Sequence, residues 1–185
     1  MTSRIFLEIA ILLLLFLLNG IFAMAELAIV SSRRERLQIL ADAGNANART
    51  AIELSRDPSN LLSTVQVGIT LIGILAGAFG GATLTAELAK LLAPLPVIGS
   101  YAEVVALIIV VSAITYGSVV LGELVPKQFA LRNPERIAAS LARPMYILSR
   151  LTRPVVRLLN LTTAGVLRLL GVRGSGQDES VSEEE

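Results

Sequence analysis

Gly117-Ser118-Val119-Val120-Leu121-Gly122-Glu123-Leu124-Val125-Pro126-Lys127 is the end of an apolar run that starts near residue 104. The run has roughly the 20 residues that an α-helix needs to cross a bilayer. It therefore predicts a membrane span, with Glu123 inside its last turns. An ionisable side chain in a span is costly to bury, so it marks a candidate functional site.

The residues around Glu123 suggest what this site binds. Pro126 has no backbone N–H, so the carbonyl of Gly122, four residues earlier, loses its helical donor. Gly122 also lets a second backbone or an ion approach closely. The segment thus offers a carboxylate and a carbonyl oxygen at one depth, and hard cations such as Mg²⁺ prefer oxygen ligands. The alternative is a kinked helix end in which Glu123 pairs with Lys127.

The overall composition is too apolar for an ordinary soluble domain, with 54% hydrophobic residues and a mean hydropathy of +0.69. The chain has no cysteine and no histidine, which removes thiolate metal sites and the commonest general base. The sequence also shows no nucleophile–base pair and no nucleic-acid-binding motif. We therefore expect an all-α integral membrane protein that is not an enzyme and binds no nucleic acid.

Three apolar runs, residues 5–30, 61–84 and 103–125, predict three transmembrane helices. Arginines at positions 33, 34 and 36 follow the first run, and the positive-inside rule makes that end cytoplasmic. Only Arg4 and Lys90, among the 16 basic residues, fall on the predicted outer side. We expect a multi-pass protein of the inner (plasma) membrane with its N-terminus outside and its C-terminus inside.

The segments between and after the spans are more polar. Residues 35–57 predict two short cytoplasmic helices with a break at 43–45, and residues 85–100 predict the outer connection. From residue 133, arginines recur every seven positions, which favours a basic amphipathic helix in the cytoplasmic interface. Contact with anionic membrane lipids is one role for this helix, and a lever that links the spans to a cytosolic domain is another. Pro144 and Pro154 are expected to kink or break this helix.

These patterns divide the chain into two parts. Residues 1–173 form a transmembrane domain with juxtamembrane helices. Residues 174–185 are rich in glycine, serine and acidic residues, which is typical of a flexible linker. We expect this linker to lead to C-terminal cytosolic domains.

The second span carries Gly73, Gly77 and Gly81 at four-residue spacing, a pattern that allows close helix packing. Gln66 and Thr70 lie on the same stripe, nearer the cytoplasm. Three helices are few to enclose an ion path, so we expect a homodimer that packs through this stripe or through the third span.

Polar side chains from all three spans are predicted in the inner half of the membrane. Glu26 lies on the order of 10 Å below the cytoplasmic boundary, and Glu123 lies at a similar depth. Gln66 and Thr70 join them from the second span, with Asn19 deeper in the first. This convergence predicts a cation site. The alternatives are that Asn19, Gln66 and Thr70 bond between helices and that Glu26 pairs with an arginine after the first span.

Four motifs carry a resemblance to a known family: NGIFAMAELA at residues 19–28, SRRERL at 32–37, STVQVGITLIG at 63–73 and GELVPK at 122–127. Together they resemble the transmembrane domain of the CNNM/CorC family of magnesium transport proteins. The resemblance implies a dimer, three spans with interfacial helices, and a following pair of CBS domains. It also implies a Mg²⁺ site that faces the cytoplasm, with Glu123 as a ligand beside carbonyls of a π-type turn, and Mg²⁺ export with Na⁺ as a candidate coupling ion.

The chain also departs from the magnesium-binding branch of that family, which has serines in the first span and an asparagine in the second. In this chain Ala23 and Ala25 lie near the positions of those serines, and Gly73 lies near the position of that asparagine. Some relatives are tied to polyamine export, so an exporter of putrescine or cadaverine is an alternative. A non-transporting membrane sensor or anchor for cytosolic regulatory domains is another.

The leading hypothesis is a homodimeric cation transporter that exports Mg²⁺. In this hypothesis Glu123 binds the ion and Gly122 offers its carbonyl, while Glu26 contributes charge. Lys127 neutralises Glu123 when the ion is absent. Three polar side chains complete the cavity: Gln66, Thr70 and Asn19.

Overall fold

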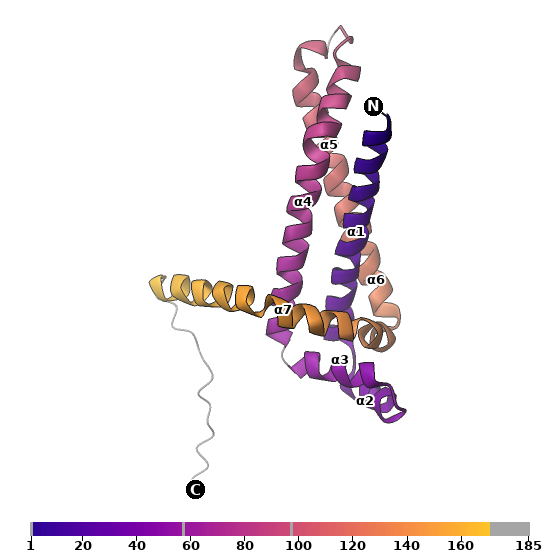
Figure 1. Ribbon diagram of the computed structural model, residues 1–185, viewed down its shortest axis with the longest axis vertical. Coiled ribbons are helices and arrows are strands. Elements are labelled where there is room, and N and C mark those ends of the chain that lie inside the picture. Colours follow the sequence, from indigo (N-terminus) through magenta and orange to yellow (C-terminus); the bar gives the residue numbers. More distant parts are fainter. Residues whose placement is uncertain (1, 57, 97, 171–185) are drawn as a thin grey trace.

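The protein is an elongated helical bundle (Figure 1). The computed structural model describes residues 2–56, 58–96 and 98–170, and the regular elements in these ranges are all helices. Three long helical stretches lie side by side, with the N-terminus and the α4–α5 connection at one end and the short helices at the other. All three are long and apolar enough to cross a membrane, which confirms the predicted all-α membrane fold.

The first two spans are single helices. The first is α1, Thr2–Ser31, and the second is α4, Pro58–Leu92. The prediction for the outer connection was wrong in part, because α4 continues eight residues beyond residue 84. That extension is rich in Ala, Leu, Glu and Lys, which all favour helix, and it contains an ion pair of 2.7 Å between Glu87 and Lys90.

The third span consists of several helical segments. It begins with a 3-10 turn, Gly99–Tyr101 (η1), and α5, Ala102–Val119. A five-residue π-helix, Val120–Leu124 (η2), follows and leads into α6, Val125–Arg132. The helix therefore runs past the predicted end at residue 125. Along this span, α5 packs mainly on α4, whereas η2 and α6 pack on α1.

Two short helices follow the first span, as predicted: α2, Arg34–Asp42, and α3, Ala46–Arg56. The break between them is at Gly44, whose φ of +92° favours glycine. The side chain of Asn45 then accepts hydrogen bonds from the backbone N–H groups of Asn47 and Ala48, at 3.0 and 3.3 Å. These bonds satisfy donors that the first turn of α3 leaves free.

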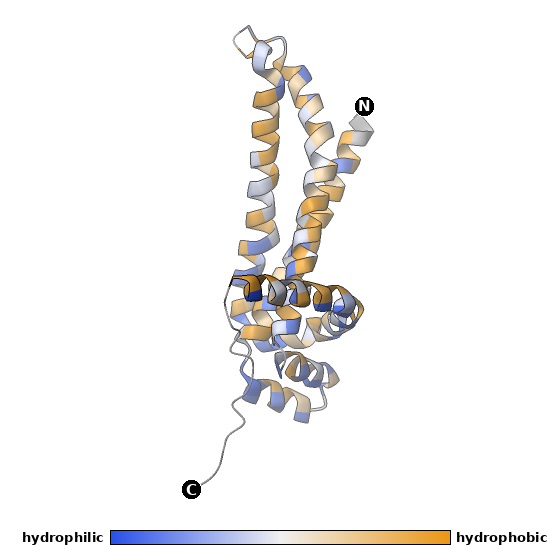
Figure 2. Ribbon diagram, turned by 90° about the vertical axis from the view of Figure 1, so that its left-hand side faces the viewer, coloured by the Kyte–Doolittle hydropathy of each residue, from blue (hydrophilic) through white to orange (hydrophobic). Residues whose placement is uncertain are grey.

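The last helix, α7, is Pro134–Leu169 and lies across the ends of the spans (Figure 1). It alternates between hydrophilic and hydrophobic residues, in contrast to the mostly apolar spans (Figure 2). Of the two expected effects of Pro144 and Pro154, a kink or a break, the break does not occur, because one helix continues through both. Ser140 and Arg150, whose carbonyls lose their donors, are exposed, so other polar groups can satisfy those carbonyls.

The main hydrophobic core lies where the spans meet the short helices, and not along the spans. Its fully buried members include Ile29, Leu37, Leu61 and Val65 from α1, α2 and α4. Arg36 and Glu135 add an ion pair of 3.9 Å between α2 and α7. This packed base fixes the ends of α1, α4 and α6 that lie nearest the short helices, and the candidate site lies just beyond it.

The glycines of α4 have two kinds of surroundings. A Cβ at Gly68 would meet the ring of Phe22 at 3.0 Å, and one at Gly80 would meet Leu12 at 2.8 Å, so these glycines let α1 approach. A Cβ at Gly73, Gly77 or Gly81 would meet nothing within 4 Å. The predicted stripe is therefore uncovered in a single chain. Residues 171–185, which include the predicted linker, lie outside the described ranges.

Candidate cation site

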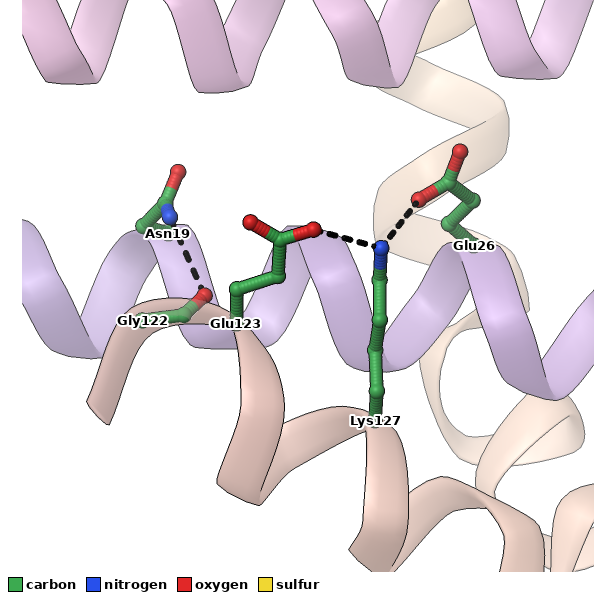
Figure 3. Close-up of polar contacts among 5 residues, drawn as sticks. All are labelled: Asn19, Glu26, Gly122, Glu123 and Lys127. Carbon is green, nitrogen blue, oxygen red and sulfur yellow. Dashed lines mark hydrogen bonds and ion pairs between the residues drawn. The ribbon is translucent and has the colours of Figure 1, made fainter. Parts of the chain in front are cut away.

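One ammonium group and two carboxylates form the centre of the site (Figure 3). The Nζ atom of Lys127 lies 2.8 Å from Oε1 of Glu123 and 3.8 Å from Oε2 of Glu26. The side chains of Glu26, Glu123 and Lys127 are 22%, 43% and 32% exposed. The structure therefore brings together the two acids that the sequence placed at one depth. It also shows the predicted Glu123–Lys127 pair, whereas Glu26 pairs with Lys127 and not with an arginine after the first span.

The π-helix positions Glu123 and its neighbour Gly122. The N–H of Val125 bonds to the carbonyl of Val120, five residues back, which is the π pattern. Gly122 is buried, and its carbonyl accepts a 3.0 Å hydrogen bond from Nδ2 of Asn19 on α1. This confirms both the π-type turn and the bond across helices that was one interpretation of Asn19.

The other end of the Asn19 side chain is a free acceptor. Asn19 is 5% exposed, and its Oδ1 is buried without a hydrogen-bond partner among the described residues. In Figure 3 this oxygen points away from Gly122, and the second oxygen of Glu123 faces the same side. An unsatisfied buried oxygen is costly, so this space suits a ligand that brings positive charge or donors.

The structure does not bring every predicted residue to this point. Gln66 and Thr70 on α4 are exposed, and neither side chain makes a hydrogen bond within the described residues. They continue the uncovered glycine stripe toward the inner end of α4. Ala23 and Ala25 are fully buried. A single chain therefore supplies the site from α1 and the third span alone.

The donor set of one chain fits a cation only in part. The oxygen donors are the Glu26 and Glu123 carboxylates, Asn19 Oδ1 and the Gly122 carbonyl. No group of three or more acidic, histidine or cysteine side chains that could hold a metal occurs in the described ranges. Mg²⁺ needs near-octahedral oxygen coordination but keeps several of its waters in protein sites, so two carboxylates are enough to begin one.

A separate cavity of about 870 Å³ lies at the opposite end of the bundle, between α4 and α5. Three alanines of α4 line one wall, and Lys90 and Glu103 are also among the lining residues. Lys90 already pairs with Glu87. The lining is mainly apolar and offers no pair of free carboxylates, so we place the cation site at Glu123 and not here.

A family model for the cyclin M (CNNM) transmembrane N-terminal domain matches residues 9–185. The chain belongs to the CNNM family. This CNNM domain is 47% identical over 184 residues to a UPF0053 protein of Synechocystis, covering all of this chain and 41% of the relative. It is 37% identical over 166 residues to an uncharacterized protein of Mycobacterium tuberculosis, covering 89% of this chain and 47% of that protein.

A more distant relative has a functional name. The polyamine export protein of Haemophilus influenzae is 25% identical over 184 residues, covering all of this chain and 42% of the relative. The CNNM domain described here thus spans less than half the length of these curated relatives. Membership of the family is consistent with a role in membrane transport.

Proposed function

We propose that this CNNM domain is the membrane part of a cation exporter, and not an enzyme, with Mg²⁺ as the leading substrate. The observation that carries the proposal is the convergence of Glu26 and Glu123, from two different spans, on one cationic group. Carboxylates inside a span are costly unless they are paired. Here the protein's own lysine supplies the pairing charge, and a cargo cation can take its place.

Mg²⁺ would bind Glu123 first, since this carboxylate lies beside the Gly122 carbonyl and the free oxygen of Asn19. Glu26 would add charge from α1. When the cation binds, it displaces Lys127 from the two carboxylates. When the cation leaves, Lys127 returns to them. Glu26 and Glu123 are therefore paired with a positive charge in both states. The proposed location is the inner (plasma) membrane, with Na⁺ as a candidate coupling ion.

The proposed functional unit is a homodimer. The stripe of Gly73, Gly77 and Gly81 is uncovered in the single chain, and such stripes allow two helices to approach closely. Gln66 and Thr70 lie on the same exposed face, so pairing along it would bury these polar side chains at the contact between the two copies. The CBS-type cytosolic domains that the resemblance implies are also proposed partners.

A diamine such as putrescine or cadaverine is a second candidate substrate, favoured by one specific observation. The group that already lies between Glu123 and Glu26 is the primary ammonium of Lys127. The site therefore has the charge and the hydrogen-bond acceptors for an alkylammonium head. A relative named as a polyamine export protein agrees with this alternative.

Flux measurements on the full-length protein in proteoliposomes test the function. Vesicles would be loaded with Mg²⁺ or putrescine, and movement of each substrate would be followed in wild type and in Glu123→Gln. Glu103→Gln is the matched control, because Glu103 is an exposed acid at the other end of the same span. Mg²⁺ flux that is lost only in Glu123→Gln supports the proposal.

Other results distinguish the alternatives. Glu123-dependent flux of putrescine without flux of Mg²⁺ would show that the site is correct and that the substrate is a diamine. Binding of Mg²⁺ without any flux would identify a sensor or anchor for cytosolic domains. Flux that is unchanged in Glu123→Gln would refute the site itself.

A further inference from the structure

A second cavity, unrelated to the cation site, lies where α7 crosses the inner end of α4. It has a volume of about 440 Å³. Ser59 and Asn60 from the first turn of α4 line one side, and Arg153, Arg157 and Asn160 of α7 line the other. The crossing is fixed by a 3.2 Å hydrogen bond between the hydroxyls of Thr152 and the buried Thr64.

The cavity has an excess of positive charge. Arg153 and Arg157 are one helical turn apart on α7, and both line the cavity. Neither side chain makes an ion pair or a hydrogen bond with any described residue. Glu53 shares only an adjoining, smaller hollow with Arg153. Two neighbouring guanidinium groups without acidic partners form a suitable site for a phosphate group, which they can bind through charge-assisted hydrogen bonds.

The apolar lining indicates which phosphate compound fits. Val156 and Leu161 also line the cavity, and Leu158 and Leu161 are 64% and 65% exposed. Beyond the crossing, α7 extends away from the three spans (Figure 1), so no span of the same chain covers these leucines. The cavity is also level with the start of α4, which is one end of the second candidate span. Headgroup phosphates lie at that level and acyl chains lie just beneath them.

We infer that this cavity is a binding site for an anionic phospholipid of the inner leaflet. Arg153 and Arg157 hold the headgroup phosphate, Asn160 and Ser59 contact the polar headgroup, and the acyl chains lie against Val156 and Leu161. Because the site joins α4 to α7, a bound lipid fixes the position of α7 relative to the second span. This inference does not depend on which cation the protein carries.

Lipid binding by the full-length protein in a neutral detergent tests the inference. Wild-type protein would be titrated with dimyristoyl phosphatidylglycerol or with phosphatidylcholine of the same chain length, and retained lipid and thermal stability would be measured. The site variant is Arg153→Gln with Arg157→Gln. The matched control is Arg143→Gln with Arg150→Gln, which removes the same charge from exposed positions of α7 outside the cavity.

We expect wild type and the control to retain one phosphatidylglycerol per chain and to be stabilised by it. The site variant should bind that lipid about tenfold more weakly or worse, because charge-assisted hydrogen bonds are lost. Phosphatidylcholine should bind poorly to all three. A second variant, Arg153→Lys with Arg157→Lys, keeps the charge and should bind at an intermediate strength, and circular dichroism checks that each variant is folded.

Three results would overturn the inference. Equal loss of binding in the site variant and the control would show general attraction to the basic helix without a site. Equal stabilisation by glycerol 3-phosphate, which has no acyl chains, would identify a soluble phosphate compound as the ligand. If dimer formation in lipid-free protein shields the side chains of Arg153 and Arg157 from solvent, a second copy of the chain covers the cavity.

Discussion

Asn19 and Gly122 are 103 positions apart in the chain, and a hydrogen bond of 3.0 Å joins the side-chain amide of the first to the carbonyl of the second. The bond gives the carbonyl a donor at the point where Pro126 cannot supply one. It also holds α1 against the π-helix that carries Glu123. The geometry of the candidate site therefore depends on Asn19, whose amide nitrogen binds the backbone of Gly122 and not a cargo ion.

Gly122→Ala should destabilise the protein, because a Cβ there would lie 2.8 Å from Nδ2 of Asn19. Overpacking of this kind costs about 1–3 kcal/mol. Gly165→Ala on α7 is the control: its Cβ meets nothing within 4 Å, and alanine favours a helix over glycine by roughly 0.5–1 kcal/mol. Thermal unfolding in detergent should show a lower midpoint for the first variant only, and similar midpoints for both would contradict the importance of this contact.

Lys127→Gln should raise the affinity of the site for a cation. In the proposed function the lysine competes with the cargo for Glu123 and Glu26. A partly exposed ion pair contributes about 0.2–1 kcal/mol, which corresponds to an increase in affinity of up to about fivefold. Calorimetric titration with Mg²⁺ and with putrescine measures the change. Lys90→Gln removes a similar ion pair, at 2.7 Å from Glu87, and should have no effect. Weaker binding by Lys127→Gln would show that Lys127 helps to hold the cargo.

Gly77→Cys should form a cross-linked dimer if two copies pack along α4. These 185 residues contain no cysteine, so a single introduced thiol forms no disulfide within this domain, and the mass of the product identifies a cross-link between two copies. Leu14→Cys serves as the control, since Leu14 is exposed on α1 away from the glycine stripe. Oxidation in native membranes followed by electrophoresis gives the readout. Cross-linking at Leu14 but not at Gly77 would place the dimer interface elsewhere.

Thr64→Val and Thr152→Val should each destabilise the crossing of α4 and α7 by about 1 kcal/mol, because each removes a side-chain hydrogen bond. Thr64 Oγ1 is 2.8 Å from the carbonyl of Asn60 and 3.2 Å from Thr152 Oγ1. The effects should not add in the double variant, since both changes remove one shared bond. Denaturation of the three variants measures this coupling, and strict additivity would mean that the two hydroxyls act independently.

The hydropathy of the sequence was sufficient to predict the spans, because crossing a bilayer requires length and apolar composition and both can be counted. The ends of the elements were harder to place. The sequence becomes less apolar after residue 84, which suggested that a connection to the third span begins there. Helix-favouring residues instead extend α4 to Leu92. In α7 the prolines interrupt the hydrogen bonds of two exposed positions without ending the helix.

The candidate site could be predicted in part. The Glu123–Lys127 pair follows from helical spacing, and Gly122 follows from the missing donor of Pro126. The pairing of Glu26 with Lys127 depends on how α1 and α6 are rotated against each other, and sequence spacing within one helix carries no information on that rotation. Gln66 and Thr70 were expected to join the site, but the face of α4 that they occupy is uncovered in the single chain.

The π-helix at residues 120–124 acts as a phase shift along the third span. One extra residue in a helical turn rotates everything after it by roughly 100° about the helix axis. This offset explains how one continuous span packs on α4 through α5 and on α1 through α6. Deleting a single residue there would hardly change the length or hydropathy of the span, yet it would turn the ammonium of Lys127 away from Glu26 and separate the two acids from their common cation.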